Sequence, residues 1–239
     1  MKNFELLDYK NGYIYISVDS ETEKKIRLNS CKREPQTVEW IDQLPDGSVF
    51  FDIGANVGCY TLIAADQNKK GKNIQVYSFE PHFANFNSLV MNIQHNKLEE
   101  YITPINMGVC DKEELSKLFH WDQYKTGESG SSGHQLNRKN DFEGNKFEPI
   151  AMQSILSISI DIFCKIYKIF PNAIKIDVDG IEDLIIKGMQ SSLLTNKNLT
   201  DVLVEINEGN KDFIENIFHK AGFYSIYHNT NNNILFKRA

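Results

Sequence analysis

Five apolar segments recur along the chain and predict the strands of a parallel sheet. They fall at residues 49–53, 74–79, 102–106, 173–178 and 202–206. Each segment is apolar at nearly every position rather than at every second one. Such runs are typical of strands that helices cover on both faces of a sheet.

Segments with a helical spacing of apolar residues separate these runs. They cover residues 60–66, 84–94, 162–170, 181–188 and 211–221. Asp161 is the predicted N-cap of the third helix, and Gly188 and Gly222 mark the ends of the last two. The alternation of strands and helices predicts an α/β fold.

The two ends of the chain follow different patterns. Residues 1–47 are predicted to form a β-rich extension, with one strand after the Asn11-Gly12 turn and another around Ile26 and Leu28. At the other end, two β-rich runs flank an asparagine-rich turn and predict an antiparallel hairpin. The usual dinucleotide-binding fold ends in another parallel strand, whereas Rossmann-like methyltransferases end in such a hairpin.

The rest of the chain, residues 48–239, is predicted to be one domain that carries an insertion. Residues 111–150 are rich in glycine, serine, asparagine and lysine and break the alternation of strands and helices. A segment of this length without secondary structure is usually a functional lid or a disordered loop. We therefore expect a lid-like loop here and no second domain.

The composition limits which binding partners and which cellular compartment we expect. The 239 residues are 41% hydrophobic and carry a formal charge of −6, which argues against nucleic acid as the main partner. The four cysteines are widely spaced, which predicts free thiols in a reducing compartment. No signal peptide or membrane-spanning run is visible, so a cytoplasmic location is expected. The pattern leaves a homodimer open.

The segment VFFDIGANVGCYTL carries the strongest chemical signal. A buried strand ends near Asp52, and Gly54, Ala55, Asn56 and Gly58 form a glycine-bearing turn into a helix. In open α/β sheets this position binds ligands, because glycines allow close approach of the backbone. Asn56 replaces the second glycine of a dinucleotide motif, and Asp52 suits a cationic ammonium better than a pyrophosphate.

The segment IQVYSFEP places Glu80 at the end of the next strand, followed by Pro81. A carboxylate at this position can accept both hydrogen bonds of a ribose diol. A helix-capping Glu-Pro turn would explain Glu80 alone. Glu80 and the glycine turn together favour a cofactor that contains adenosine.

The segment IKIDVDGIEDLIIKGM places Asp177 and Asp179 at the end of another strand. Acidic groups at such a strand end can orient an amino group, bind a metal or act as a base. Asp179 is equally well explained as the N-cap of the helix that follows. This reading does not fit Asp177, which lies inside an otherwise apolar strand.

The runs FDIGANVGCYTL, FEPHFANFNSLVMN, KIDVDGIEDLIIKGM and VLVEIN, in this order, resemble the FkbM family of S-adenosylmethionine-dependent methyltransferases. The resemblance covers roughly residues 48–225. It departs from the family pattern at Asp179, where glutamate is commoner, and at Ile181, where a small residue is commoner. It implies a Rossmann-like sheet, mostly parallel with a C-terminal antiparallel hairpin, and methyl transfer to a hydroxyl of a sugar or natural product.

The resemblance also implies residue roles. Asp52, Gly54, Asn56 and Gly58 would surround the methionine part of the donor, and Glu80 would hold the ribose. The segment from Asn106 through Gly108 to Val109 would lie near the adenine, and Asp177 near the reacting methyl group. A small sugar or nucleotide-sugar acceptor is expected.

A general base must take up the proton of the acceptor hydroxyl. The candidates are Asp177, Asp179, Glu205 and, within the insertion, His134. A Mg²⁺ site made by Asp177, Glu205 and Asn207 is an alternative that we do not favour. Two rival functions stay open, an NAD-dependent nucleotide-sugar oxidoreductase and a binding module for S-adenosylmethionine without activity.

Overall fold

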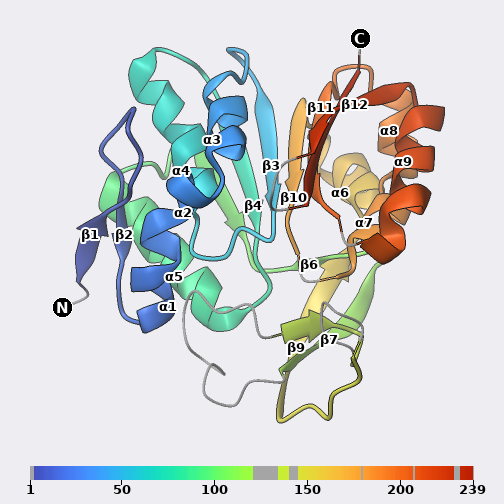
Figure 1. The fold of residues 1–239 in the computed structure, drawn as a ribbon, viewed down its shortest axis with the longest axis horizontal. Helices are drawn as coiled ribbons and strands as arrows, with labels where there is room; N and C mark the ends of the chain where they lie inside the picture. Colours follow the sequence, from blue (N-terminus) through green and yellow to red (C-terminus); the bar gives the residue numbers. More distant parts are fainter. Residues whose placement is uncertain are drawn as a thin grey trace. The chain divides into compact units, whose positions relative to one another are not determined.

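The computed structural model describes residues 3–120, 134–139, 145–178, 180–206, 208–228 and 232–238 (Figure 1). Its described residues fall into two compact units, one up to Asn106 and the other from Met107 onward. We call them unit 1 and unit 2. Among the described residues, no helix is long and apolar enough to span a bilayer.

Unit 1 begins with a short antiparallel pair of strands and a run of short helices. These elements are β1 (Phe4–Leu6), β2 (Tyr15–Ser17), α1 (Glu21–Lys25), the 3-10 turn η1 (Arg27–Asn29), α2 (Ser30–Arg33) and α3 (Pro35–Asp42). The second strand that we predicted around Ile26 and Leu28 is therefore wrong. Ser20 and Glu23 form a capping box that starts α1, and Pro35 occupies the first turn of α3, so local capping favours helix here.

The rest of unit 1 is a parallel three-stranded sheet with its crossover helices. The elements are β3 (Val49–Ile53), α4 (Cys59–Asp66), η2 (Gln67–Lys70), β4 (Gln75–Phe79), α5 (Phe83–Asn96) and β5 (Ile102–Ile105). All three predicted strands and both predicted helices are confirmed. Phe50, Phe51 and Phe79 are fully buried, and each such side chain contributes roughly 2–3 kcal/mol of hydrophobic stabilisation.

Unit 2 contains a small sheet followed by a second parallel pair and the C-terminal hairpin. The small sheet has the order β6 (Gly108–Val109), β9 (Ala151–Ile158), β7 (Glu114–His120) and β8 (His134–Leu136). The later elements are α6 (Ile160–Tyr167), β10 (Ala173–Ile176), α7 (Glu182–Lys187), α8 (Gln190–Thr195), β11 (Asp201–Glu205), η3 (Glu208–Asn210), α9 (Lys211–Lys220), β12 (Phe223–His228) and β13 (Asn233–Arg238).

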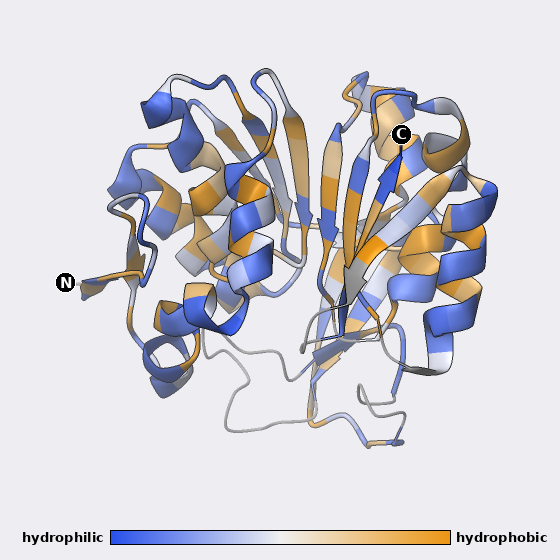
Figure 2. Ribbon diagram, turned by 45° about the horizontal axis from the view of Figure 1, so that its top comes forward, coloured by the Kyte–Doolittle hydropathy of each residue, from blue (hydrophilic) through white to orange (hydrophobic). Residues whose placement is uncertain are grey.

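Strands β10 and β11 pair in parallel, and β13 runs antiparallel to both β11 and β12. The predicted fold class is therefore confirmed: a mostly parallel α/β fold with a C-terminal antiparallel hairpin and a short pair of β-strands near the N-terminus. The prediction that residues 1–47 are rich in β structure is wrong, because α1, α2 and α3 cover more of this segment than β1 and β2 do. In Figure 2 the strands of the parallel pairs carry long hydrophobic runs, while the helices combine hydrophobic and hydrophilic positions. The four cysteines are free and buried, as expected.

The insertion is more regular than its composition suggests. Strands β7 and β8 fall within residues 111–150, so the prediction of a structureless loop is wrong for Glu114–His120 and His134–Leu136. Buried and exposed residues alternate along β7, and all seven of its residues pair with β9. This alternation favours a strand over a loop. Residues 121–133 and 140–144 lie outside the described part.

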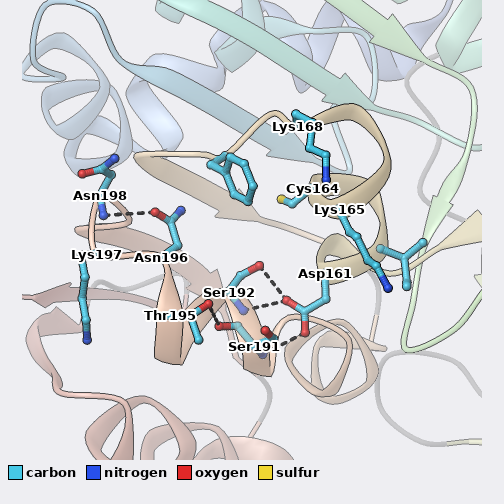
Figure 3. Close-up of a pocket in the computed structure, with 12 residues that line it drawn as sticks. Asp161, Cys164, Lys165, Lys168, Ser191, Ser192, Thr195, Asn196, Lys197 and Asn198 are labelled. Atoms are coloured by element: carbon cyan, nitrogen blue, oxygen red, sulfur yellow. Dashed lines mark hydrogen bonds between the residues drawn. The ribbon is translucent and has the colours of Figure 1, made fainter.

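The predicted start and end of α6 are also wrong. Ser159 rather than Asp161 is its N-cap, and the helix ends at Tyr167 because Lys168 takes a left-handed conformation with φ 58°. Asp161 instead accepts hydrogen bonds from the backbone N–H groups of Ser191 and Ser192, at 2.8 and 2.7 Å (Figure 3). It therefore satisfies the first turn of α8, a helix that we did not predict.

Candidate functional site

The turn between β3 and α4 has a left-handed backbone at three positions. The φ angles are 83° at Gly54, 52° at Asn56 and 93° at Gly58. Glycine adopts such angles without strain, and asparagine tolerates them better than most residues. The N–H groups of Gly54 and Ala55 both donate to the carbonyl of Phe79 at 3.0 Å, so the turn is fixed to the end of β4.

Gly58 has a second reason to be glycine. A Cβ atom built there would lie 2.5 Å from Cδ1 of Leu89 on α5. The backbone of the turn therefore packs directly against α5. We had attributed the glycines to a close approach of the ligand, and at Gly58 the close neighbour is this helix.

Glu80 connects the turn to the end of β4. Its Oε2 accepts the N–H of Asn56 and its Oε1 the N–H of His82, each at 2.8 Å. The side chain is buried, and burial raises its pKa to about 7 although both N–H groups and the charge of Arg27 lower it. Each carboxylate oxygen has two lone-pair positions, so a ribose diol can still donate to Glu80.

Asn106, just after β5, lies beside Glu80. Its Nδ2 donates to the carbonyls of Glu80 and Pro81, at 2.8 and 3.1 Å. Glu80 and Pro81, predicted from one segment, and Asn106, implied by the family resemblance, are therefore together in unit 1. They form a cluster with the turn at residues 54–58, and we call this cluster with its turn the donor loop.

Asp52 lies under the donor loop and is almost fully buried, with 1% of its surface exposed. Its Oδ2 accepts the hydroxyl of Thr61 at 2.6 Å, and the same hydroxyl lies 2.8 Å from that of Ser78. This hydrogen-bonded chain joins β3, α4 and β4. Contact of Asp52 with an ammonium group stays a prediction.

The acidic candidates in unit 2 lie at two strand ends. Asp177 follows β10 and forms an ion pair with Lys175, whose side chain is fully buried. Glu205 ends β11 and lies opposite Asn233 of β13. Asp179 and Asn207 lie outside the described residues. Within the described part of the chain, no group of three or more His, Cys, Asp or Glu residues is placed to hold a metal ion.

The other unit 2 candidates lie in the small sheet. Gly108 and Val109 form β6, where both are buried, and a Cβ on Gly108 would lie 2.9 Å from Ile155. His134 belongs to β8 and not to a mobile loop, and its ring centroid is 5.8 Å from that of His120. The adenine role of β6 and the catalytic role of His134 stay predictions.

The sequence analysis missed several polar residues that the structure shows to be buried. Besides Thr61 and Lys175, Glu182 is fully buried, and its Oε1 accepts the N–H of Gly180 at 3.0 Å. Burial raises the pKa of Glu182 to about 7, and the neighbouring carboxylates of Asp177 and Asp183 add to the effect. Lys175 was detectable, because a charged residue between two isoleucines of a buried strand requires a partner.

Two cavities are lined by none of the predicted site residues. One, of about 560 Å³, lies in unit 2 beside α6 and α8, and Lys165, Lys168 and Lys197 contribute to its lining (Figure 3). The other, of about 460 Å³, lies in unit 1 between the N-terminal segment and α3 and is lined by Tyr9 and Asp42 among others. Neither cavity includes any residue of the donor loop.

The sequence profile described as Methyltransferase FkbM domain matches residues 52–225. The chain belongs to the FkbM methyltransferase family. Family and fold imply that this methyltransferase binds S-adenosylmethionine, and the chemistry of the donor loop fits such a ligand, since Glu80 can accept from a ribose diol. Family membership also disfavours the NAD-dependent alternative.

Similarity to individual proteins is weaker. The methyltransferase is 22% identical over 204 residues to the hexuronic acid methyltransferase AglP of Haloferax volcanii, covering 83% of this chain and 73% of that protein. The crystal structure of an FkbM methyltransferase from Methylobacillus flagellatus KT matches 87% of this chain with a TM-score of 0.50 and 14% identity. This chain spans 59% of the length of that protein.

A precorrin-6y C5,15-methyltransferase from Geobacter metallireducens GS-15 also matches with a TM-score of 0.50, at 10% identity, over 87% of this chain and 88% of its own. At this level of identity the two structural similarities show the fold alone. They confirm the predicted Rossmann-like methyltransferase fold.

Proposed function

We propose that this methyltransferase transfers the methyl group of S-adenosylmethionine to a hydroxyl oxygen of an acidic sugar, either a hexuronic acid or a conjugate of one. The name of the AglP relative supports the acceptor class, and that similarity extends over 83% of the chain. The negative net charge of −6 agrees with a small-molecule acceptor rather than nucleic acid.

The geometry of Glu80 carries the donor part of the proposal. Two backbone N–H groups hold its carboxylate at the end of β4, beside a turn with three left-handed residues. A carboxylate fixed in this way does not have to reorganise when a ribose diol binds. The rigid turn then sets where the rest of the donor lies.

S-adenosylmethionine supplies an activated methyl group when bound, so the protein has to orient the acceptor and remove one proton. We propose that Asp177 accepts the proton of the acceptor hydroxyl. An ion pair with the ammonium of Lys175 holds this carboxylate in place. Asp179, Glu205 and His134 are the alternative bases.

Labelled methyl transfer to a panel of acceptors tests the proposal. The panel pairs glycosides of hexuronic acids with the matching neutral hexosides. We expect label in the hexuronic acids, in a product that resists mild alkali, because an ether is stable where a methyl ester hydrolyses. Label confined to neutral sugars, or released completely by alkali, would contradict the proposed acceptor or the proposed oxygen.

A further inference from the structure

The N-terminal extension, which precedes the matched residues 52–225, is attached to the donor loop. The amide of Asn92 on α5 bridges the two, because its Oδ1 accepts the N–H of Ser17 at 2.7 Å and its Nδ2 donates to the carbonyl of Val57 at 2.8 Å. Asn92 is fully buried. A buried amide that is satisfied on both sides fixes the two segments to one another.

A second set of contacts places η1 and α2 against the first turn of α4. The thiol of Cys59 lies 3.5 Å from the carbonyl of Arg27, and the hydroxyl of Tyr60 donates to the carbonyl of Ser30 at 3.3 Å. Cys59 directly follows Gly58. The backbone of Arg27 therefore lies next to the end of the donor loop.

The guanidinium of Arg27 acts on the same region. It lowers the pKa of both Glu80 and Cys59 by Coulomb attraction, against the larger effect of burial. Glu80 belongs to the donor loop and Cys59 directly follows it, so the charge of Arg27 acts on the loop and on the start of α4. Arg27 itself is half-buried.

We propose that Arg27 binds a ligand carboxylate beside the donor loop, so that the N-terminal extension contributes directly to the active site. Asp52 and Glu80 are the acidic side chains of this region, and Arg27 is the cation that acts on Glu80. The planar guanidinium can donate two parallel hydrogen bonds to a carboxylate, a geometry that lysine does not offer.

Two ligands could supply this carboxylate. One is the methionine part of the donor, and the other is the hexuronic acid acceptor, a source that rests on the proposed function. The donor source can be tested by binding alone. Its outcome is therefore independent of whether any acceptor is methylated.

The donor experiment compares two ligands by calorimetric titration. S-adenosylhomocysteine carries the carboxylate, and 5′-methylthioadenosine lacks the whole amino-acid part. The titrations are made at pH 8, where Glu80 is largely ionised. If the donor is the source, Arg27→Gln weakens S-adenosylhomocysteine roughly 10–100-fold, the range of a hydrogen bond to a charged group, and 5′-methylthioadenosine less than twofold. Arg27→Lys should recover part of the loss, because it keeps the charge without the fork.

The acceptor experiment compares KM for a hexuronic acid glycoside and its neutral counterpart. If the acceptor is the source, Arg27→Gln raises KM for the acidic sugar alone. Arg33→Gln, on an exposed arginine at the end of α2, is the control and should change neither experiment. Circular dichroism and thermal unfolding confirm that each variant is folded.

A selective loss in either experiment supports the proposal and identifies the source of the carboxylate. Equal weakening of S-adenosylhomocysteine and 5′-methylthioadenosine, with no selective change of KM, would overturn it. Arg27 would then act only through the position of Glu80. No change in either experiment would overturn it as well.

Discussion

Glu80 should make nucleoside binding depend on pH. Its pKa is raised from 4.5 to about 7 by burial, so the free protein is largely protonated at this position at pH 6. A ribose diol donates hydrogen bonds to the carboxylate and therefore favours the ionised form. Binding below pH 7 must then release a proton.

The size of the effect follows from this linkage. If the bound form stays ionised, the affinity at pH 6 should be roughly tenfold weaker than at pH 8, with a plateau above pH 7.5. The suitable ligand is 5′-methylthioadenosine, because it has the ribose diol without the amine and carboxylate of the full donor. Calorimetry in buffers of different ionisation enthalpy measures the released proton directly.

Glu80→Gln should abolish this pH dependence and weaken binding roughly 10–150-fold at pH 8. The corresponding control is Asp66→Asn, which changes another buried carboxylate of unit 1, paired with Lys69 at 2.8 Å. The reasoning fails if the wild-type affinity is flat between pH 6 and 8, or if Glu80→Gln binds like the wild type. Removing the 2′-hydroxyl of 5′-methylthioadenosine should weaken its binding to the wild type. The same removal should change its binding to Glu80→Gln only slightly.

Raising the pH should strengthen ligand binding through Glu80 but weaken the stability of the ligand-free fold. A raised carboxyl pKa means that the folded state binds more protons than the unfolded state between pH 4.5 and 7, so Glu80 destabilises the ligand-free fold progressively over that range. The pKa difference corresponds to about 3 kcal/mol above pH 7. Comparing urea unfolding of wild type and Glu80→Gln at pH 5 and pH 8 should show the variant gaining in relative stability at pH 8.

Three further predictions concern packing and buried charge. Gly58→Ala should destabilise the fold by about 2–4 kcal/mol in urea unfolding, because strain at a positive φ adds to a clash with Leu89. Gly71 has a similar φ and open space around it, so Gly71→Ala should lose only about 1–2 kcal/mol. Equal losses in the two variants would contradict the clash. Asp177→Asn should destabilise the fold by about 3 kcal/mol because it removes the anion that pairs with the buried ammonium of Lys175. Lys175→Met should lose less, because Asp177 is partly exposed, and the reverse order would refute this explanation. Asn92→Asp should speed amide hydrogen exchange more in the donor loop than in β2, because it keeps the acceptor for Ser17 and removes the donor to Val57. An equal increase of the exchange rate in both segments would argue against the bridge.

The strands could be predicted because their signal is local. The segments that form β3 and β10 are apolar at nearly every position, and burial on both faces leaves few alternatives. The short helices between residues 21 and 42 lack this signal. They are five, four and eight residues long, and helices of this length depend on caps and tertiary packing rather than on sequence period.

The donor loop was predictable for a related reason. Glycines and acids at strand ends are arranged by the topology of an open α/β sheet, which places strand ends and turns at fixed points. Asp52 and Glu80 were both expected at the ligand. Only the structure shows that Asp52 supports α4 through Thr61 while Glu80 holds the turn itself.

The ion pair of Asp177 with Lys175 was not predicted, although the sequence contains the information for it. In a strand, residues two apart lie on the same side, so Lys175 and Asp177 had to be neighbours once β10 was predicted. A lysine buried in an apolar strand needs a partner, and the nearest acid on its side is Asp177. This pairing changes the chemical argument, because Asp177 then also compensates the charge of a buried lysine. A loss of turnover in Asp177→Asn will therefore combine a chemical and a structural effect. They can be separated by Lys175→Met, which removes the ammonium and leaves the carboxylate in place. If Asp177 accepts the proton, Lys175→Met should keep measurable turnover while Asp177→Asn loses nearly all of it, whereas equal losses in the two variants would assign Asp177 a structural role.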